Sequence, residues 1–243
     1  MLERSPDYIS LAARYDERYR YQTLAGVGAT LAAFIRQRKF QRLLEVGCGT
    51  GHWLMQLSDV PLRVGLDRSR AMLAQAHRKE AALPLVHAGA EALPFETDTF
   101  DCVLCVNALH HFNAPQQFFA EAYRVLCPGG VVAIIGKDPR ASDDRIWYYP
   151  YFPETYEIDL CRYPSYESMQ EWMTAAGFRQ LAWQVAQHLS DPQHGRQILS
   201  NPFLQKHHSS QLALLSEEAY QAGIRRIMAV IEEAESRGEM AVF

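Results

Sequence analysis

The stretch from Arg42 to Leu57, RLLEVGCGTGHWLMQL, constrains the fold more than any other part of the chain. It begins with a short apolar run typical of a buried strand and ends with apolar residues at helical spacing. Between the two, Gly47, Gly49 and Gly51 occupy every second position. Glycines at the start of a helix expose backbone N–H groups and let a ligand approach the main chain. The stretch therefore predicts a ligand-binding turn between a strand and a helix.

Strand and helix patterns alternate along the chain around this turn. The predicted strands cover 42–47, 62–67, 85–88, 100–106 and 131–136, and the predicted helices cover 52–57, 69–79 and 115–126. Pro128-Gly129-Gly130 and Ala176-Gly177 are helix-ending signals, and a further strand pattern over 178–186 follows the second. Such alternation is typical of an α/β fold with a doubly wound, mostly parallel sheet.

The C-terminal part of the chain is predicted to be mostly helical. Its last helix begins after Ser216, where acidic residues occupy the first turn. The apolar end, 239–243, predicts a seventh strand beside 178–186. We expect a single domain over 1–243 made of a sheet core (about 40–190 plus 238–243), an N-terminal helical segment (1–38) and a helical cap (191–237) inserted before the last strand at the carboxyl edge of the sheet.

Charge and hydropathy argue against several classes of partner. The chain has 24 Lys and Arg residues and 28 Asp and Glu residues, so its formal net charge is -4. No basic run is long enough to follow a phosphate backbone. No apolar run approaches the ~20 residues of a membrane span, and the N-terminus lacks the pattern of a secretion signal. We therefore expect a soluble, cytoplasmic protein that binds neither nucleic acid nor a membrane.

The cysteines and the paired histidines do not predict a metal site. Cys102 and Cys105 form a C-x-x-C pair, but in an apolar strand their side chains would point to opposite faces. We expect them to be buried hydrophobic residues rather than a redox or metal pair. His207 and His208 have no further ligands near them in the sequence, so solvated side chains are expected there.

An acidic residue follows the glycine turn at a meaningful distance. Asp67 ends the strand predicted over 62–67, sixteen residues after Gly51. At that edge of the sheet, a carboxylate can accept hydrogen bonds from both hydroxyls of a ribose. The spacing of the three glycines differs from the dinucleotide fingerprint G-x-G-x-x-G, so a ribose-containing ligand other than NAD is favoured.

Five blocks between residues 40 and 137 carry a family resemblance. They are LLEVGCGTG, GLDRSRAML, AGAEALPFETDTFD, CVLCVNALHHF and RVLCPGG, in this order. In them the chain resembles the class I S-adenosylmethionine-dependent methyltransferases of small-molecule type, which include ubiquinone- and menaquinone-biosynthesis enzymes and trans-aconitate methyltransferase. The resemblance implies a Rossmann-like methyltransferase fold, S-adenosyl-L-methionine as methyl donor, S-adenosyl-L-homocysteine as product and a small-molecule acceptor.

The resemblance also implies which residues meet the cofactor. They are Glu45, Gly47, Cys48, Gly49, Gly51, Asp67, Arg68, Ala90, Glu91 and Asn107. The glycines would curve around the methionine portion, the first acidic residue would lie near its amino group, and Asp67 would hold the ribose. Where relatives often carry an acidic residue for the adenine amino group, this chain has Gly89, so either Glu91 supplies that contact or it is missing.

The catalytic side is less constrained by the sequence. Methyl transfer from a sulfonium is an in-line displacement, so the protein chiefly positions the nucleophile and excludes water. A general base is needed only when the nucleophile carries a proton. His110 and His111, directly after the fourth predicted strand, are candidate bases, and a structural role is the alternative because the LHHF block resembles one shared by relatives with different substrates.

Aromatic and arginine residues suggest the acceptor site. Tyr148, Tyr149, Arg145 and Arg162 lie between the fifth predicted strand and the next helix, and Tyr15 and Tyr19 lie in the N-terminal segment. Aromatic walls with guanidinium groups suit a flat or anionic molecule, so a carboxylic acid, or else a phenol, is the expected acceptor. The alternative is that these side chains pack their own loop and helix. In similar proteins a Tyr-Asp pair like Tyr15-Asp16 closes over the cofactor.

Two other functions compete with methyl transfer. An NAD-dependent oxidoreductase would use the same turn, and a non-catalytic module would bind S-adenosylmethionine without transferring its methyl group. Methylation of nucleic acid is disfavoured because NALHHF replaces the Asn/Asp-Pro-Pro-aromatic block that base-modifying relatives use. A monomer or a homodimer is expected.

Overall fold

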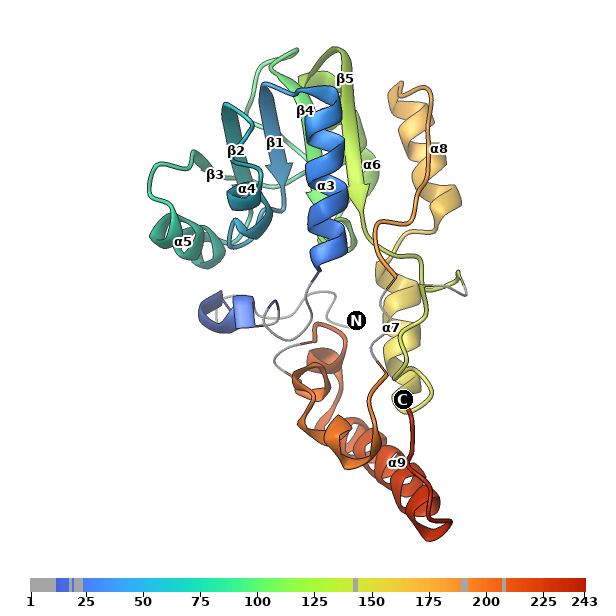
Figure 1. Cartoon of the computed structure of the whole chain (residues 1–243). Coiled ribbons are helices and arrows are strands. Elements are labelled where there is room, and N and C mark those ends of the chain that lie inside the picture. Colours follow the sequence, from blue (N-terminus) through green and yellow to red (C-terminus); the bar gives the residue numbers. More distant parts are fainter. Residues whose placement is uncertain (1–11, 18, 20–23, 142–143, 189–191, 207–208) are drawn as a thin grey trace. The chain divides into compact units, whose positions relative to one another are not determined.

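The structure is a computed structural model, and it describes residues 12–17, 19, 24–141, 144–188, 192–206 and 209–243. The contacts divide the chain into two compact units (Figure 1). The sheet unit contains the described residues within 7–137 and 165–188, and the helical unit contains those within 138–164 and 189–243. The aromatic-rich segment after the fifth strand therefore belongs with the C-terminal helices. The single-domain organisation stays a prediction.

The sheet unit is built around a five-stranded parallel sheet with the strand order β3-β2-β1-β4-β5. The strands are β1 (Arg42–Val46), β2 (Leu62–Asp67), β3 (Leu85–His87), β4 (Phe100–Val106) and β5 (Leu126–Ile135). The order reverses between β1 and β4, and all carboxyl ends lie along one edge. A crevice for a ligand is expected outside that edge at such a reversal. The predicted doubly wound α/β fold is confirmed.

Helices form where the sequence predicts them, and their ends have recognisable causes. The sheet unit contains α3 (Ala25–Arg38), α4 (His52–Gln56), α5 (Arg70–Lys79), α6 (Pro115–Val125) and α8 (Tyr166–Ala176), with 3₁₀ turns η1 (Ala12–Glu17) and η2 (Leu109–His111). The side chain of Ser69 accepts a hydrogen bond from the N–H of Met72 and caps α5. Gly177, at φ 113°, ends α8 in the left-handed conformation.

The sheet has a hydrophobic core on each face. Val103 and Cys105 pack in one core cluster with the α6 phenylalanines, whereas Cys102 and Leu104 pack in the other with residues of α3 and α4. Figure 1 shows α3 and α6 on opposite faces of the sheet. Both cysteines are completely buried, and burial raises the pKa of each thiol. The prediction that they are buried hydrophobic residues on opposite faces is confirmed.

The helical unit has a core of its own. It contains α7 (Pro153–Arg162), α9 (Glu217–Ser236) and the 3₁₀ turns η4 (Gly195–Ser200), η5 (Pro202–Leu204) and η6 (Leu212–Leu214). The side chain of Ser216 accepts a hydrogen bond from the N–H of Ala219 and caps α9, as its sequence predicts. Phe152, Ile198 and Ile227 are among the fully buried residues that hold these elements together.

Two predicted strands are absent from the described part of the sheet, so the seven-stranded prediction is not confirmed. Residues 178–188 are not assigned as strand, and 50% of Trp183 and 64% of Val185 is exposed. The segment contacts α3 instead of a strand: its Ala186 carbonyl accepts from the Thr30 hydroxyl at 2.9 Å. The C-terminal prediction is also wrong, because Val242 forms an isolated antiparallel bridge with His194 inside the helical unit.

The start of β5 differs from its prediction. β5 begins at Leu126 rather than at 131, so Pro128-Gly129-Gly130 lies inside the strand, opposite a register shift between Phe100 and Cys102 of β4. No helix within the described ranges is long and apolar enough to cross a membrane.

One glycine of α9 allows Phe152 to pack closely against the helix. A Cβ atom at Gly223 would lie 2.0 Å from Cε1 of the buried Phe152. Alanine is the better helix former by about 1 kcal/mol, but overpacking a core costs about 1–3 kcal/mol. Gly223→Ala is therefore expected to lower the free energy of unfolding in a denaturant titration. Adding Phe152→Leu, which makes room, should recover part of the loss, and strictly additive costs would contradict this assignment.

Candidate cofactor-binding site

The glycine turn joins β1 to α4, as its sequence predicts, and has a left-handed backbone at all three glycines. Gly47, Gly49 and Gly51 have φ values of 75°, 53° and 74°, which side chains with a Cβ atom rarely adopt. The N–H groups of Gly47 and Cys48 both donate to the carbonyl oxygen of Leu66 in β2, at 2.8 and 3.1 Å. The turn is thus attached to the carboxyl end of the neighbouring strand.

The three glycines serve different purposes. A Cβ atom at Gly47 would lie 2.4 Å from the Cβ of Ala108, and one at Gly51 would lie 3.3 Å from the Cβ of Ala76. At Gly49 a Cβ atom would meet no atom of the described residues within 4 Å. Gly47 and Gly51 therefore allow close packing, whereas Gly49 faces open space where a ligand can approach the backbone.

Asp67 connects the glycine turn to the start of α5. Its Oδ2 accepts from the N–H of Gly49 at 2.8 Å, and its Oδ1 accepts from the N–H of Ser69 at 2.7 Å. Burial raises the pKa of this carboxyl, and the two N–H bonds act in the opposite direction. Each carboxylate oxygen has a second lone pair, so the side chain can hold the turn and still accept bonds from a ribose.

Glu45 is a buried carboxyl at the end of β1. Its side chain belongs to a residue only 1% exposed, and neither oxygen has a hydrogen-bond partner among the described residues. Burial, and then the charge of Asp67, raise the pKa of Glu45 well above its ordinary value, and the nearby backbone of Leu54 acts in the opposite direction. A buried carboxylate without a partner is costly, and a cationic ligand group would relieve that cost. The amino group of S-adenosylmethionine is such a cation, so the residues present fit this ligand.

Cys48 has no reactive character. It is 5% exposed, and burial together with the charges of Glu45 and Asp67 raises the pKa of its thiol well above the ordinary value. A neutral, buried thiol is a poor nucleophile. The residue packs in the core cluster that contains residues of α3 and α4.

The end of β4 is the second strained part of this edge. Asn107 is exposed and has a left-handed φ of 51°, and its N–H donates to the carbonyl oxygen of Ile135 at 2.8 Å. Non-glycine residues in this conformation cost free energy and are concentrated at functional sites. His110 and His111 follow in η2, with ring centroids 3.9 Å apart. Their role as bases stays a prediction.

The residues expected near the adenine have mixed surroundings. Arg68 is exposed, and its carbonyl oxygen is 3.0 Å from Nε2 of His87, while Ala90 is buried in the core. Oε1 of Glu91 accepts from the backbone N–H groups of Asn113 at 2.8 Å and Ala114 at 3.4 Å, at the start of α6. Oε1 of Glu91 therefore holds the backbone that precedes α6.

Gly89 lies close to the carboxylate of Glu91. A Cβ atom there would lie 3.0 Å from Oε2 of Glu91. An acidic side chain at this position would therefore crowd the carboxylate of Glu91. Whether Glu91 itself contacts adenine stays a prediction.

The N-terminal segment reaches the glycine turn. Asp16, in η1, accepts a hydrogen bond from the Thr50 hydroxyl and pairs with Lys79 at the end of α5. The ring of Tyr19 stacks on His52, with centroids 3.5 Å apart and planes 6° apart. The sequence suggested that Asp16 lies near the cofactor. No periodicity or motif indicated its contacts with Thr50 and Lys79, because these three residues belong to separate segments of the chain. Tyr15 lies half-buried in η1.

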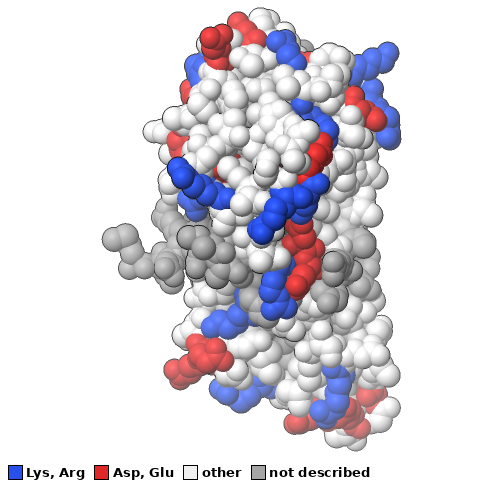
Figure 2. Space-filling view, turned by 90° about the vertical axis from the view of Figure 1, so that its left-hand side faces the viewer, with Lys and Arg blue, Asp and Glu red and all other residues white. Residues whose placement is uncertain are grey.

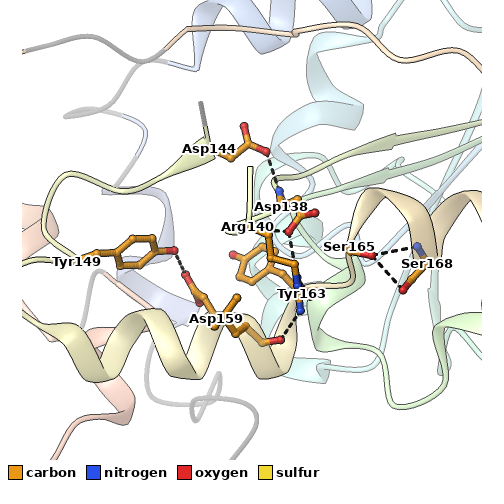
Figure 3. Close-up of polar contacts among 9 residues, drawn as sticks. Asp138, Arg140, Asp144, Tyr149, Asp159, Tyr163, Ser165 and Ser168 are labelled. Atoms are coloured by element: carbon orange, nitrogen blue, oxygen red, sulfur yellow. Dashed lines mark hydrogen bonds and ion pairs between the residues drawn. The ribbon is translucent and has the colours of Figure 1, made fainter. Parts of the chain in front are cut away.

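The acceptor candidates of the aromatic segment lie in the helical unit. The Tyr149 hydroxyl donates to Oδ2 of Asp159 at 2.7 Å (Figure 3). The Tyr148 hydroxyl lies 3.1 Å from Oγ of Ser209, and burial together with Asp159 raises the pKa of Tyr149. These tyrosines are buried inside their own unit, which is the packing alternative considered above.

The arginines of this segment also contact their own unit. Arg162 donates to the carbonyl oxygen and to Oγ of Ser210, each at 3.4 Å, and the guanidinium carbon of Arg145 lies 5.7 Å from the Tyr156 ring centroid. Arg140, which the sequence did not single out, donates to Oδ1 of Asp138 at 3.0 Å and to two carbonyl oxygens at the end of α7 (Figure 3). It stabilises a helix end, where cations are favourable.

Charge and metal-binding residues add little to the site. Lys and Arg are interspersed with Asp and Glu on the face displayed in Figure 2. In the part of the chain that the structure describes, no group of three or more His, Cys, Asp or Glu side chains could hold a metal ion. His207 and His208 lie outside the described residues.

Known proteins with this arrangement are methyltransferases. Residues 44–134 match the family model described as a methyltransferase domain. The chain is 30% identical over 184 residues to the uncharacterized methyltransferase YcgJ of Bacillus subtilis, covering 70% of each protein. The crystal structure of YcgJ superposes with a TM-score of 0.53 and 23% identity, covering 79% of this chain and 87% of that one.

A plant enzyme matches over a shorter region. The chain is 33% identical over 143 residues to the chloroplastic 2-methyl-6-phytyl-1,4-hydroquinone methyltransferase 2 of Oryza sativa subsp. japonica. The match covers 57% of this chain and 39% of the rice protein, so the chain corresponds to less than half of that relative's length.

The parallel sheet and the glycine turn define a class I methyltransferase fold. The chain belongs to the methyltransferase family that includes YcgJ.

The pKa of Glu45 predicts a pH-dependent stability of the ligand-free protein. Its folded-state pKa lies above the ordinary 4.5, so the stability contributed by the protonated carboxyl is present below pH 4.5 and is lost as the pH rises towards the folded-state pKa. Glu45→Gln cannot titrate. The free energy of unfolding of Glu45→Gln, relative to that of the parent, should therefore increase as the pH rises above 4.5, by up to about 1.4 kcal/mol per pH unit. Denaturant titrations at several pH values measure this, and parallel curves would contradict it.

Proposed function

We propose that this protein transfers a methyl group from S-adenosylmethionine to a small-molecule acceptor. The observation that carries the proposal is Gly49, whose left-handed backbone faces open space while its N–H is held by Asp67. A turn kept open in this way allows a ligand to lie against the main chain. Family membership supports the identity of that ligand.

Residues around the turn have the chemistry to hold the methyl donor. Glu45 would accept its amino group, because that carboxyl is buried without a hydrogen-bond partner among the described residues. Asp67 would accept the ribose hydroxyls with its remaining lone pairs, and the backbone at Gly47 and Gly49 would contact the methionine portion. Arg68, Ala90 and Glu91 are proposed near the adenine and Asn107 near the methionine end. When bound, S-adenosylmethionine supplies an electrophilic methyl group on a positively charged sulfur.

The protein's own part in the reaction is to position the acceptor and to exclude water. If the acceptor is a hydroxyl, its proton must leave during methyl transfer, and His110 or His111 is the proposed base because both follow β4 at the carboxyl edge. A carboxylate acceptor would need no base. Substitution of both histidines therefore distinguishes the two acceptor classes once turnover is measured.

A phenol or hydroquinone is the proposed acceptor, with a carboxylic acid as the second candidate. Arg162, which suggested an anionic acceptor, donates to Ser210 in the helical unit, and Arg145 lies over Tyr156. The rice relative's name gives a hydroquinone as its substrate. Tyr15 and Tyr19 of the N-terminal segment remain proposed contacts to a flat ring.

A cytoplasmic location, a monomer or homodimer, and the absence of nucleic-acid partners remain predictions.

The two competing functions, an oxidoreductase and a non-catalytic module, predict different binding and turnover from methyl transfer. An NAD-dependent oxidoreductase would bind NAD at the glycine turn, and a non-catalytic module would bind S-adenosylhomocysteine without turnover on any acceptor.

Calorimetric titration of the whole chain tests the proposal first. S-adenosylhomocysteine is expected to bind with a micromolar dissociation constant, about −8 kcal/mol, and NAD is expected not to bind. A screen of phenols and carboxylic acids for release of S-adenosylhomocysteine from S-adenosylmethionine then identifies the acceptor class. Binding of NAD instead, or of neither ligand, would overturn the proposal.

Gly49 can be tested against a matched glycine outside the site. Gly49→Ala places a methyl group in the open space above the turn and should weaken S-adenosylhomocysteine binding about tenfold or more, roughly 1.4 kcal/mol. Gly238 has a left-handed φ of 71° and also faces open space, so Gly238→Ala carries a similar backbone strain of about 1–2 kcal/mol. The control should keep the parent's affinity. Equal losses in both variants would assign the effect to strain alone.

A further inference from the structure

We propose that Asp16 and Lys79 form an ionic latch that positions Thr50 and thereby preorganises the glycine turn for its ligand. The inference rests on the proposed function, because it concerns the same turn. Asp16 and Lys79 are positioning residues here: they act through Thr50, and neither is assigned a contact with the methyl donor.

Three segments meet at the latch. Asp16 comes from η1, Lys79 from the last residue of α5, and Thr50 from the glycine turn. The carboxylate of Asp16 accepts from the Thr50 hydroxyl and pairs with the Lys79 ammonium. The same ammonium donates to the Thr50 carbonyl oxygen at 2.9 Å. The three groups close a ring of polar contacts that holds Thr50 at both its side chain and its backbone.

The position of Thr50 gives these contacts their effect. It lies between Gly49 and Gly51, and glycines lose more conformational freedom on ordering than any other residue. Thr50 is 2% exposed, so its hydroxyl is taken out of water and needs the carboxylate of Asp16. Fixing this residue adds to the bonds that the N–H groups of Gly49 and Gly51 already make, and so helps to order the turn before a ligand arrives. Ordering in advance removes a cost that binding would otherwise have to meet.

A second contact holds the N-terminal segment on the other side of Gly51. The ring of Tyr19 stacks on His52 and meets Trp53 edge-on, with centroids 5.9 Å apart. Burial lowers the pKa of His52, so a neutral imidazole faces the tyrosine ring. The segment therefore contacts residues both before and after Gly51, the last residue of the turn.

Reciprocity follows from this arrangement. If the docked segment strengthens ligand binding, then the ligand must stabilise the docked segment by the same factor. The side chains of Lys79 and Asp16 are 32% and 37% exposed, so salt should weaken the latch. These consequences do not depend on turnover and can be measured with S-adenosylhomocysteine alone.

The latch is tested by calorimetry with S-adenosylhomocysteine on the whole chain. Asp16→Asn and Lys79→Met should each weaken binding about 5- to 20-fold, and the double variant should be no weaker than the worse single variant. Glu17→Gln and Arg78→Met are matched controls on the same elements, since Glu17 pairs with Arg14 and Arg78 is exposed. Both controls should bind as the parent does. Thermal unfolding confirms that each variant is folded.

Limited proteolysis supplies the reciprocal measurement. S-adenosylhomocysteine should slow tryptic cleavage after Arg14 in the parent, and this protection should be lost in Asp16→Asn. If the parent binds the ligand while both variants keep its affinity, the latch is overturned and the proposed function stands. Additive losses in the double variant would also overturn it. If the parent does not bind the ligand, the proposed function and the latch fall together.

Discussion

The carboxylate of Asp67 is the interaction on which the candidate site depends. It accepts one N–H bond from Gly49 and one from Ser69, so a single side chain ties the turn after β1 to the turn after β2. Backbone N–H groups at the start of a helix have no hydrogen-bond partners within the helix. A carboxylate there accepts their hydrogen bonds, and its negative charge interacts favourably with the positive end of the helix dipole. Desolvation opposes this arrangement and raises the pKa of Asp67. The site therefore contains a partly buried anion whose remaining lone pairs are suited to hydroxyl donors.

Close packing and ligand access divide the glycines of this chain into two groups. Gly47 approaches Ala108, and Gly223 approaches Phe152, so closely that a Cβ atom at either position would force a neighbour to move. Gly49 differs, because a left-handed backbone rather than crowding requires glycine there. Crowding fixes how elements pack, whereas an uncrowded strained turn leaves room for something outside the chain. Gly238 is also left-handed and uncrowded, so the contact of Gly49 with Asp67 is what distinguishes the glycine turn as the candidate site.

Each unit contains a buried carboxyl group, and the surroundings of the two differ. In the helical unit, Tyr149 and Gln211 both donate to Oδ2 of Asp159, and this network holds α7 against the segment that follows η5. In the sheet unit, the carboxyl of Glu45 is buried without a partner among the described residues. The Asp159 hydrogen bonds join parts of one interior, whereas the Glu45 carboxyl lies beside the glycine turn, where a cationic ligand group would offset the cost of its burial.

Local sequence determined much of this protein. Apolar periodicity identified the strands from β1 to β5, Ser69 and Ser216 identified helix starts, and the glycine spacing followed by Asp67 predicted a ligand-binding turn. These features depend on residues close together in the chain, so one sequence suffices to find them. Only the tertiary structure decided that 178–186 contacts α3 and is not a strand of the sheet. It also decided that the tyrosines of the aromatic segment pack inside the helical unit, and that Asp16 contacts Thr50 and Lys79. Such contacts join segments far apart in the chain, and hydrophobic pattern and propensity carry no information about which distant partner a side chain finds.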